Sequence, residues 1–172
     1  MNPKLDIIFS RRSIRKYHDK AVPDEMITDL LEAAMAAPSA VGKDPWHFIV
    51  VKNRDTLDKL VDILPNAKML HQATAAFIVC GDITKAHIQA ESYMLQDLSA
   101  ATQNILIAAK ALGLGTCWLG VHPRQERLAG ITQLFDLPDN IIPMCGIAIG
   151  WAVERPESRT RYNNERVHRE KW

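Results

Sequence analysis

Apolar residues recur at helical spacing in two long segments of the chain. In the first, between Pro23 and Pro38, one face carries the i, i+3, i+4, i+7 and i+8 positions, namely Ile27, Leu30, Leu31, Ala34 and Met35. Pro23 is expected at the first helical position, with Asp24 and Glu25 near the positive end of the helix dipole. Because Pro38 disfavours helical geometry at Ala37, we predict that the helix ends there.

The second segment, from Glu91 to Leu112, is the longest element that the pattern predicts. Its apolar positions keep the helical period and its later turns are apolar nearly all round, which is typical of a central, buried helix. Gly113 and Gly115 are expected to end it. Shorter helices are predicted over residues 3–9, over residues 55–64 and after Pro123.

Four segments have the apolar composition of β-strands, namely residues 46–51, 74–80, 116–121 and 141–151. Helices and strands are mixed without a strict βαβ repeat. A chain of 172 residues with 47% apolar residues suits one domain, so we expect a single domain over residues 1–172.

The composition shifts abruptly after Trp151. Residues 152–172 contain ten charged side chains and few apolar ones, so this segment cannot bury itself. It is either disordered or laid over another surface, and the terminal Trp172 favours the second alternative.

Charge and composition exclude several classes of partner. The 21 Lys and Arg residues nearly balance the 20 Asp and Glu residues, so no overall field recruits nucleic acid or an anionic membrane surface. No apolar run approaches the roughly 20 residues that span a bilayer, and the first residues lack the apolar core of a signal peptide. Cys80, Cys117 and Cys145 lie in apolar segments, which suits buried thiols in a reducing compartment. These features predict a cytoplasmic protein.

Hydrolase, metalloenzyme and dinucleotide-fold interpretations find no support in the motifs. The six histidines lack the short helical spacing of a metal site, and no Ser or Cys occupies a G-x-S-x-G elbow. His47, next to Trp46 in a predicted strand, is expected to be a core histidine. The glycines at 113, 115 and 120 do not fit G-x-G-x-x-G, and they lie between a helix and the following strand, the reverse of the order that aims a helix N-terminus at pyrophosphate.

Two segments have the composition of a binding site. Residues 10–17 place four cations in six residues beside Ser13, a combination that suits a phosphate; alternatively, these cations complement the end of the first helix and stay solvated. Residues 37–48 form a small-residue loop between two prolines, which lets a flat ring approach the backbone; alternatively, this is an ordinary connection with Trp46 as a core anchor.

Taken in order along the chain, these signals resemble the nitroreductase family over nearly all 172 residues, in the short, single-domain branch of that family. The motifs that carry the resemblance are Arg11-Arg12-Ser13-Ile14-Arg15, Ala37-Pro38-Ser39 with Pro45-Trp46-His47-Phe48, Ala67-Lys68-Met69-Leu70, Ala108-Ala109-Lys110-Ala111-Leu112-Gly113-Leu114-Gly115 and Arg166-Val167-His168.

The resemblance implies an α+β fold in which helices surround a central, mainly antiparallel sheet, with the C-terminal tail extending onto a dimer partner. It also implies a homodimer that binds two FMN molecules at the subunit interface. The residues expected to hold the phosphate and ribityl chain are Arg11, Arg12, Ser13 and Arg15, joined from the tail by Arg166 and His168. The residues expected to line the flavin are Pro38, Ser39 and Ala40 from the partner subunit, and Leu119, Gly120 and Val121 with a backbone N–H near the ring.

This chain departs from the family at two places. Relatives often have Asn and Gln where Gly42 and Asp44 stand here, so a side-chain contact from that loop does not carry over. An Asn that contacts flavin in larger relatives corresponds to Pro65, and Asn66 is its neighbour, retained as a candidate.

The function implied is transfer of a hydride from NADH or NADPH to FMN, followed by reduction of a nitroaromatic, quinone or similar small oxidant at the same flavin face. The cofactor supplies the redox chemistry, so no acid–base residue is assigned. One alternative is a protein of the same fold that stores, senses or remodels FMN without NAD(P)H turnover. Another is a non-enzymatic interaction domain whose charged tail wraps a partner. The sequence does not choose between NADH and NADPH.

Overall fold

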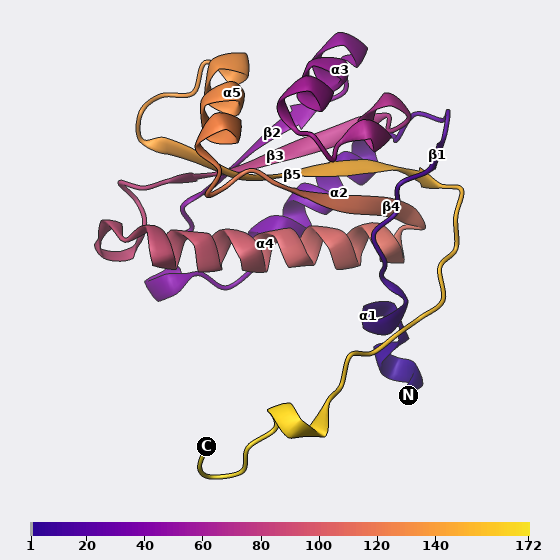
Figure 1. The fold of residues 1–172 in the computed structure, drawn as a ribbon, viewed down its shortest axis with the longest axis vertical. Coiled ribbons are helices and arrows are strands. Elements are labelled where there is room, and N and C mark those ends of the chain that lie inside the picture. The colour runs from indigo at the N-terminus through magenta and orange to yellow at the C-terminus, as the bar shows by residue number, and fades with distance from the viewer. Residues whose placement is uncertain (1) are drawn as a thin grey trace.

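A single antiparallel sheet forms the centre of the molecule. The computed structural model describes residues 2–172, so residue 1 of the expected domain lies outside it. Within that range the sheet has five strands, which are β1 (Tyr17–His18), β2 (Trp46–Val51), β3 (Ala75–Asp82), β4 (Leu114–Gly120) and β5 (Ile141–Ala152). β5 lies between β3 and β4, and β2 lies beyond β3 (Figure 1). The predicted α+β fold with a mainly antiparallel sheet is confirmed.

Helices cover both faces of the sheet. α2 (Asp24–Met35) and α4 (Glu91–Ala111) lie on one face, and α3 (Arg54–Ile63) and α5 (Gln125–Phe135) lie on the other (Figure 1). β3 is buried on both sides because its side chains alternate between the two cores: Phe77 belongs to the α2–α4 core and Ile78 to the α3–α5 core. A short helix, α1 (Asp6–Ser10), opens the fold after a 3₁₀ turn at Pro3–Leu5.

The predicted elements are observed with small shifts at their ends. α4 matches its prediction closely, and Leu98, Ala101 and Ile105 are fully buried on it. Pro23 is the N-cap of α2 rather than its first residue. β4 begins at Leu114, two residues earlier than predicted, because Gly113 takes a φ of +77° and Leu114 already pairs with Trp151.

The prediction for His47 is wrong. Along β2 the side chain of Trp46 is buried and that of His47 is exposed, as the alternation of a strand requires. The three cysteines are free and buried, as predicted.

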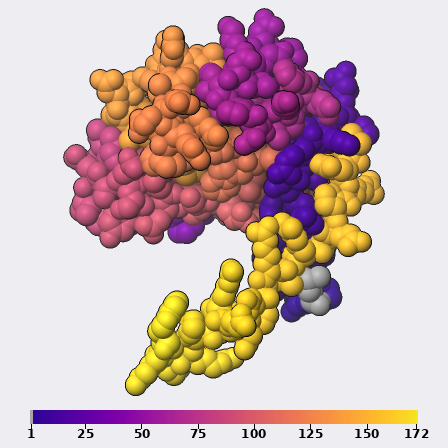
Figure 2. Space-filling model, viewed as in Figure 1, coloured from indigo at the N-terminus to yellow at the C-terminus, as the bar shows by residue number. Residues whose placement is uncertain are grey.

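The C-terminal tail leaves the sheet, follows the N-terminal segment and then projects away from the body (Figures 1 and 2). The N–H of Val153 donates to the Lys16 carbonyl at 3.0 Å, and that of Arg159 donates to the Phe9 carbonyl at 3.1 Å. Within residues 2–172, the hydrogen bonds of residues 160–172 stay inside that segment. Trp172 is fully exposed and Tyr162 is 70% exposed in the single chain.

No helix in residues 2–172 combines the length and the apolar character needed to cross a bilayer.

Candidate functional site

The basic N-terminal segment is held against the start of β4. The N–H of Ile14 donates to the Thr116 carbonyl at 2.9 Å, and Ser13 forms a parallel bridge with Thr116. This close approach depends on Gly115, because a Cβ at that position would lie 2.8 Å from Cγ2 of Ile14. Arg15 therefore projects from a fixed backbone beside β4.

Beyond Thr116 the outer edge of β4 is open. Backbone groups of one residue point to the same side of a strand, and the side alternates along it. The Thr116 carbonyl points to this open edge, where it accepts from the Ile14 N–H. The backbone N–H and C=O groups of Trp118 and of Gly120 therefore point to the same edge. The Gly120 carbonyl accepts a hydrogen bond from Arg127 Nη1 at 2.7 Å, which places the Gly120 N–H on the same open edge.

The backbone N–H of Val121 does not point to this open edge. Its side chain is fully buried, and its N–H donates to the Met144 carbonyl at 3.2 Å. Of the three residues expected beside the flavin, Leu119 and Gly120 line the cavity at this edge and Val121 does not. The structure thus gives the outward N–H to Gly120.

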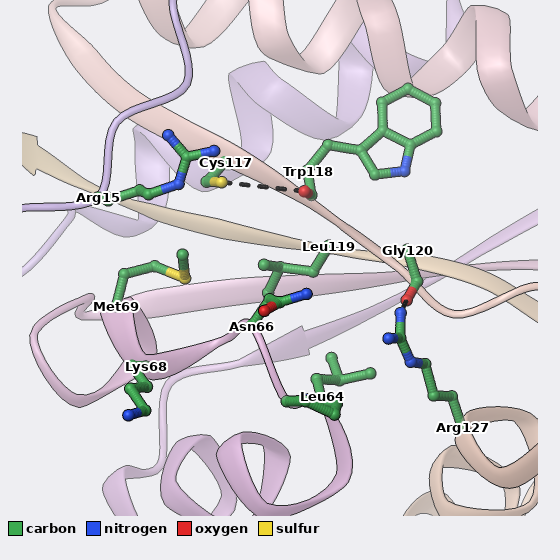
Figure 3. Close-up of a pocket in the computed structure, with 11 residues that line it drawn as sticks. Arg15, Leu64, Asn66, Lys68, Met69, Cys117, Trp118, Leu119, Gly120 and Arg127 are labelled. Atoms are coloured by element: carbon green, nitrogen blue, oxygen red, sulfur yellow. Dashed lines mark hydrogen bonds between the residues drawn. The ribbon is translucent and has the colours of Figure 1, made fainter. Parts of the chain in front are cut away.

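A cavity of about 790 Å³ opens at this edge (Figure 3). It is lined by Arg15, the turn after α3 with Asn66 and Lys68, β4 from Cys117 to Gly120, and Arg127 of α5. Among the described residues that line it, Arg15, Lys68 and Arg127 are cationic and none is acidic. The cavity is therefore suited to an anionic ligand with a partly apolar body.

The 3₁₀ turn that carries Lys68 (Lys68–His71) is fixed from α3. Arg54 Nη1 donates to the Ala73 carbonyl at 3.1 Å, and Arg54 Nη2 donates to the Leu70 carbonyl. Asp58 lies 2.9 Å from His71 Nδ1, and this hydrogen bond is the main cause that lowers the pKa of the Asp58 carboxyl. These contacts hold the Asn66 and Lys68 side of the cavity in place.

The predicted phosphate cluster is divided between two cavities. Arg15 lines the cavity at β4, whereas Arg11 and Arg12 line a second cavity of about 310 Å³ between the N-terminal segment, the end of α4 and the tail. Arg12 Nη1 donates to the Glu157 carbonyl, which ties the tail to this segment. The charge of Arg12, followed by that of Arg161, lowers the pKa of Arg159.

The small-residue loop after α2 is a constrained turn that does not line the cavity at β4. Ser39 Oγ donates to Asp44 Oδ1 at 2.5 Å, and the Asp44 N–H donates to Ser39 Oγ at 3.0 Å. Val41, Gly42 and Asp44 have φ values of +56°, +62° and +46°. Gly42 and Asp44, where relatives often have Asn and Gln, thus shape the turn that presents Pro38, Ser39 and Ala40.

The tail residues also lie apart from the cavity. Arg166 lies in a 3₁₀ turn (Asn164–Arg166), and the ring of His168 stacks on that of Trp172 with centroids 4.2 Å apart. Neither residue lines the β4 cavity in the single chain.

Cys117 lines the cavity but is not an activated nucleophile. Burial raises the pKa of its thiol above the ordinary value, so the thiolate is scarce at neutral pH. Burial raises the pKa of Cys80 and of Cys145 to about 12.

Two cavity cations were not among the predicted site residues. Lys68 belongs to a motif that carried the family resemblance, and that motif was the available signal for it. Arg127 follows Gly120 by seven residues, across a turn and the start of a helix, and no pattern in the sequence links the two.

Comparisons with known proteins show what the whole chain is similar to. A family model described as the nitroreductase family matches residues 8–66 and 64–151. A protein of Methanothermobacter thermautotrophicus provisionally named NADH dehydrogenase/NAD(P)H nitroreductase is 46% identical over 168 residues, which cover 98% of this chain and 87% of that protein. The crystal structure of a protein with the same provisional name from Bacteroides thetaiotaomicron has a TM-score of 0.93 at 40% identity, covering 100% of this chain and 99% of that one. The structure of a provisional nitroreductase from Desulfovibrio desulfuricans, in complex with FMN, has a TM-score of 0.85 at 31% identity and covers 100% of this chain and 99% of that one.

Proposed function

The chain belongs to the nitroreductase family, and from that premise we propose that it is an FMN-dependent oxidoreductase that takes hydride from NAD(P)H and reduces a nitroaromatic, quinone or similar small oxidant. The observation that carries the proposal is the cavity at the open edge of β4, with its three cations and an outward-facing peptide at Gly120. NAD(P)H dependence and FMN are in keeping with the names of the relatives and with the FMN complex of a similar structure.

The residues present fit FMN. The volume of about 790 Å³ lies in the range of small-molecule sites, roughly 300–1,000 Å³. A Cβ added at Gly120 would find only Arg127 Nη1 within 4 Å among the described residues, so the backbone there is open to a flat ring. Arg15, Asn66 and Lys68 would hold the polar side of that ring.

The phosphate of FMN would lie toward the arginines of the N-terminal segment. Arg11 and Ser13 precede Arg15 on a segment whose backbone is pinned to β4, and guanidinium groups match phosphate oxygens. Arg12 would contribute as well, in addition to its bond to the Glu157 carbonyl. This cluster suits the one terminal phosphate of FMN. The chain carries no dinucleotide-binding fingerprint that would bind the adenylate half of FAD.

When bound, FMN supplies the redox chemistry by accepting a hydride from NAD(P)H and passing two electrons to the oxidant. The chain's own residues bind and orient it and place positive charge around the ring. Because NAD(P)H and the oxidant would use the same ring face, they would occupy the site in turn, which gives a ping-pong mechanism. We assign no acid–base side chain.

The complete site is proposed to form in a homodimer. The loop with Pro38, Ser39 and Ala40 does not line the β4 cavity of its own chain, so it is free to cover the flavin of a partner. The exposed Tyr162, Val167 and Trp172 would gain a buried environment against a second chain. Docking of the tail would bring Arg166 and His168 to the flavin phosphate.

The cofactor assignment is tested by mass spectrometry of the species released from purified protein, followed by titration of the stripped protein with FMN and with FAD. We expect FMN as the main released species and tighter binding of FMN. Recovery of FAD, or equal affinity for both, would contradict the assignment.

A further inference from the structure

We infer that Arg127 is a positioning residue for the flavin ring. Its guanidinium fixes the backbone of Gly120 at the open edge of β4 and keeps a positive charge beside the ring. The site therefore favours the reduced over the oxidised cofactor. This inference rests on the proposed function. It adds a residue from α5 to a site otherwise built from the N-terminal segment, the 3₁₀ turn at Lys68 and β4.

The first argument is geometric. Gly120 is the last residue of β4, where the strand is about to turn, and among residues 2–172 no strand pairs with its outer edge. The bond from Arg127 Nη1 to the Gly120 carbonyl, 2.7 Å long, ties this edge to the first turns of α5 (Figure 3). On the other side, Val121 and His122 both donate their N–H groups to the Met144 carbonyl, at 3.2 and 3.0 Å. The peptide that joins Gly120 to Val121 is thus held at both its carbonyl and its N–H, and the N–H of Gly120, in the preceding peptide, faces the cavity.

The second argument is electrostatic. Within residues 2–172, no carboxylate forms a salt bridge with Arg127, and no acidic residue lines the cavity. The positive charge is therefore available to a ligand. A reduced flavin ring carries one more negative charge than the oxidised ring near neutral pH, and preorganised charge acts most strongly where new charge develops.

Arg124 provides a matched control. It is the N-cap of the same helix, it is exposed, and it does not line the β4 cavity. Its contribution to α5 comes from its backbone carbonyl, which accepts the N–H groups of Arg127 and Leu128 and is unchanged in an alanine variant. Arg124→Ala removes one positive charge from this region without touching Gly120.

The test measures the midpoint potential of bound FMN in the wild-type protein, in Arg127→Ala, in Arg127→Lys and in Arg124→Ala, with thermal unfolding of each to check the fold. We expect Arg127→Ala to lose at least tenfold more affinity for reduced than for oxidised FMN. For a two-electron couple this corresponds to a potential about 30 mV lower. The potential of Arg127→Lys, which keeps the charge, should fall less than that of Arg127→Ala, and the potential of Arg124→Ala should equal that of the wild type.

Three results would overturn the inference. One is an unchanged potential in Arg127→Ala, and another is an equal fall in Arg127→Ala and Arg124→Ala, which would show a general effect of net charge. If Arg127→Ala does not fold, an unchanged potential in Arg127→Gln, which removes the charge but keeps a hydrogen-bond donor, would also overturn it. A wild-type protein that binds no FMN would instead refute the proposed function itself, so the two failures are distinguishable.

Discussion

The carboxylate of Asp97, in the middle of α4, accepts a hydrogen bond from the backbone N–H of Ala40 at 2.8 Å. Asp97 is 5% exposed, and among the described residues its Oδ2 has no hydrogen-bond partner. Burying a carboxyl group with a single hydrogen-bond partner costs free energy, so its presence in the core calls for a specific role. Here it anchors the constrained loop with Pro38, Ser39 and Ala40 to the central helix.

Replacement of Asp97 by Ala should therefore destabilise the fold. A hydrogen bond to a charged group is worth about 1.5–3 kcal/mol, and the lost bond leaves the Ala40 N–H without its acceptor. We expect a loss of that size in the free energy of unfolding in urea, with a smaller loss in Asp97→Asn, which keeps an acceptor. The exposed Gln103→Ala on the same helix should change stability by less than about 0.5 kcal/mol. Equal stability of Asp97→Ala and Gln103→Ala would contradict this role.

Gly115 is predicted to be essential for placing the basic segment. A Cβ there would meet Cγ2, Cβ and Cγ1 of Ile14 at 2.8–2.9 Å, and a branched side chain at a pinned backbone cannot move aside easily. Gly115→Ala should therefore cost about 1–3 kcal/mol and weaken FMN binding by shifting Ser13 and Arg15.

Gly146→Ala is the matched control for Gly115→Ala, because its Cβ would find the nearest atom at an ordinary 3.5 Å. Flavin fluorescence titration of both variants checks the prediction. If Gly115→Ala binds FMN as tightly as Gly146→Ala does, the placement of the segment does not depend on this close approach.

Asp82 should make stability depend on pH in the acid range. Hydrogen bonds from the Thr84 side chain, then from Asn140, lower the pKa of its carboxyl from 3.8 to about 2. A carboxyl with a lower pKa in the folded state stabilises the fold above its unfolded pKa and loses that contribution as pH falls toward the folded value.

We therefore expect the stability difference between the wild type and Asp82→Asn to be constant above about pH 5 and to shrink between pH 3.8 and about 2. Urea unfolding at a series of pH values measures it. A difference that stays constant down to pH 2 would show that the Asp82 carboxyl is not held ionised by these bonds.

Deletion of residues 160–172 separates the tail from the fold. Because the hydrogen bonds of this segment stay inside it, and Arg159 keeps its bond to the Phe9 carbonyl, the truncated chain should fold normally. We expect sedimentation to show a weaker dimer and absorbance to show loss of FMN, since the deletion removes Arg166 along with the aromatic anchors. A truncated protein that remains a dimer with full flavin would refute the role proposed for the tail.

Much of the fold could be predicted from local patterns. The helical period of α4 and the apolar run of β3 are strong signals, because α4 buries one face along its whole length and every residue of β3 is buried. The exposed position of His47 was missed, because one strand-like segment does not tell which of its faces is solvated.

The site was predictable only where one motif supplied it. Arg15 and Gly120, which the resemblance singled out, line one cavity, whereas Val121 does not, because the strand turns and the Val121 N–H bonds to Met144. Arg127 and Asp97 act through contacts with residues 7 and 57 positions away, at Gly120 and Ala40, and such contacts arise only in the folded chain.

The most direct test of the central claim is the absorbance spectrum of the purified protein before and after anaerobic addition of NADH or NADPH. We predict the visible absorbance band of oxidised flavin, which is bleached by at least one nicotinamide and returns when a quinone or nitroaromatic is added. A yellow protein that neither nicotinamide bleaches would indicate flavin storage or sensing instead of turnover. A colourless protein that is not stabilised by added FMN would contradict the account as a whole.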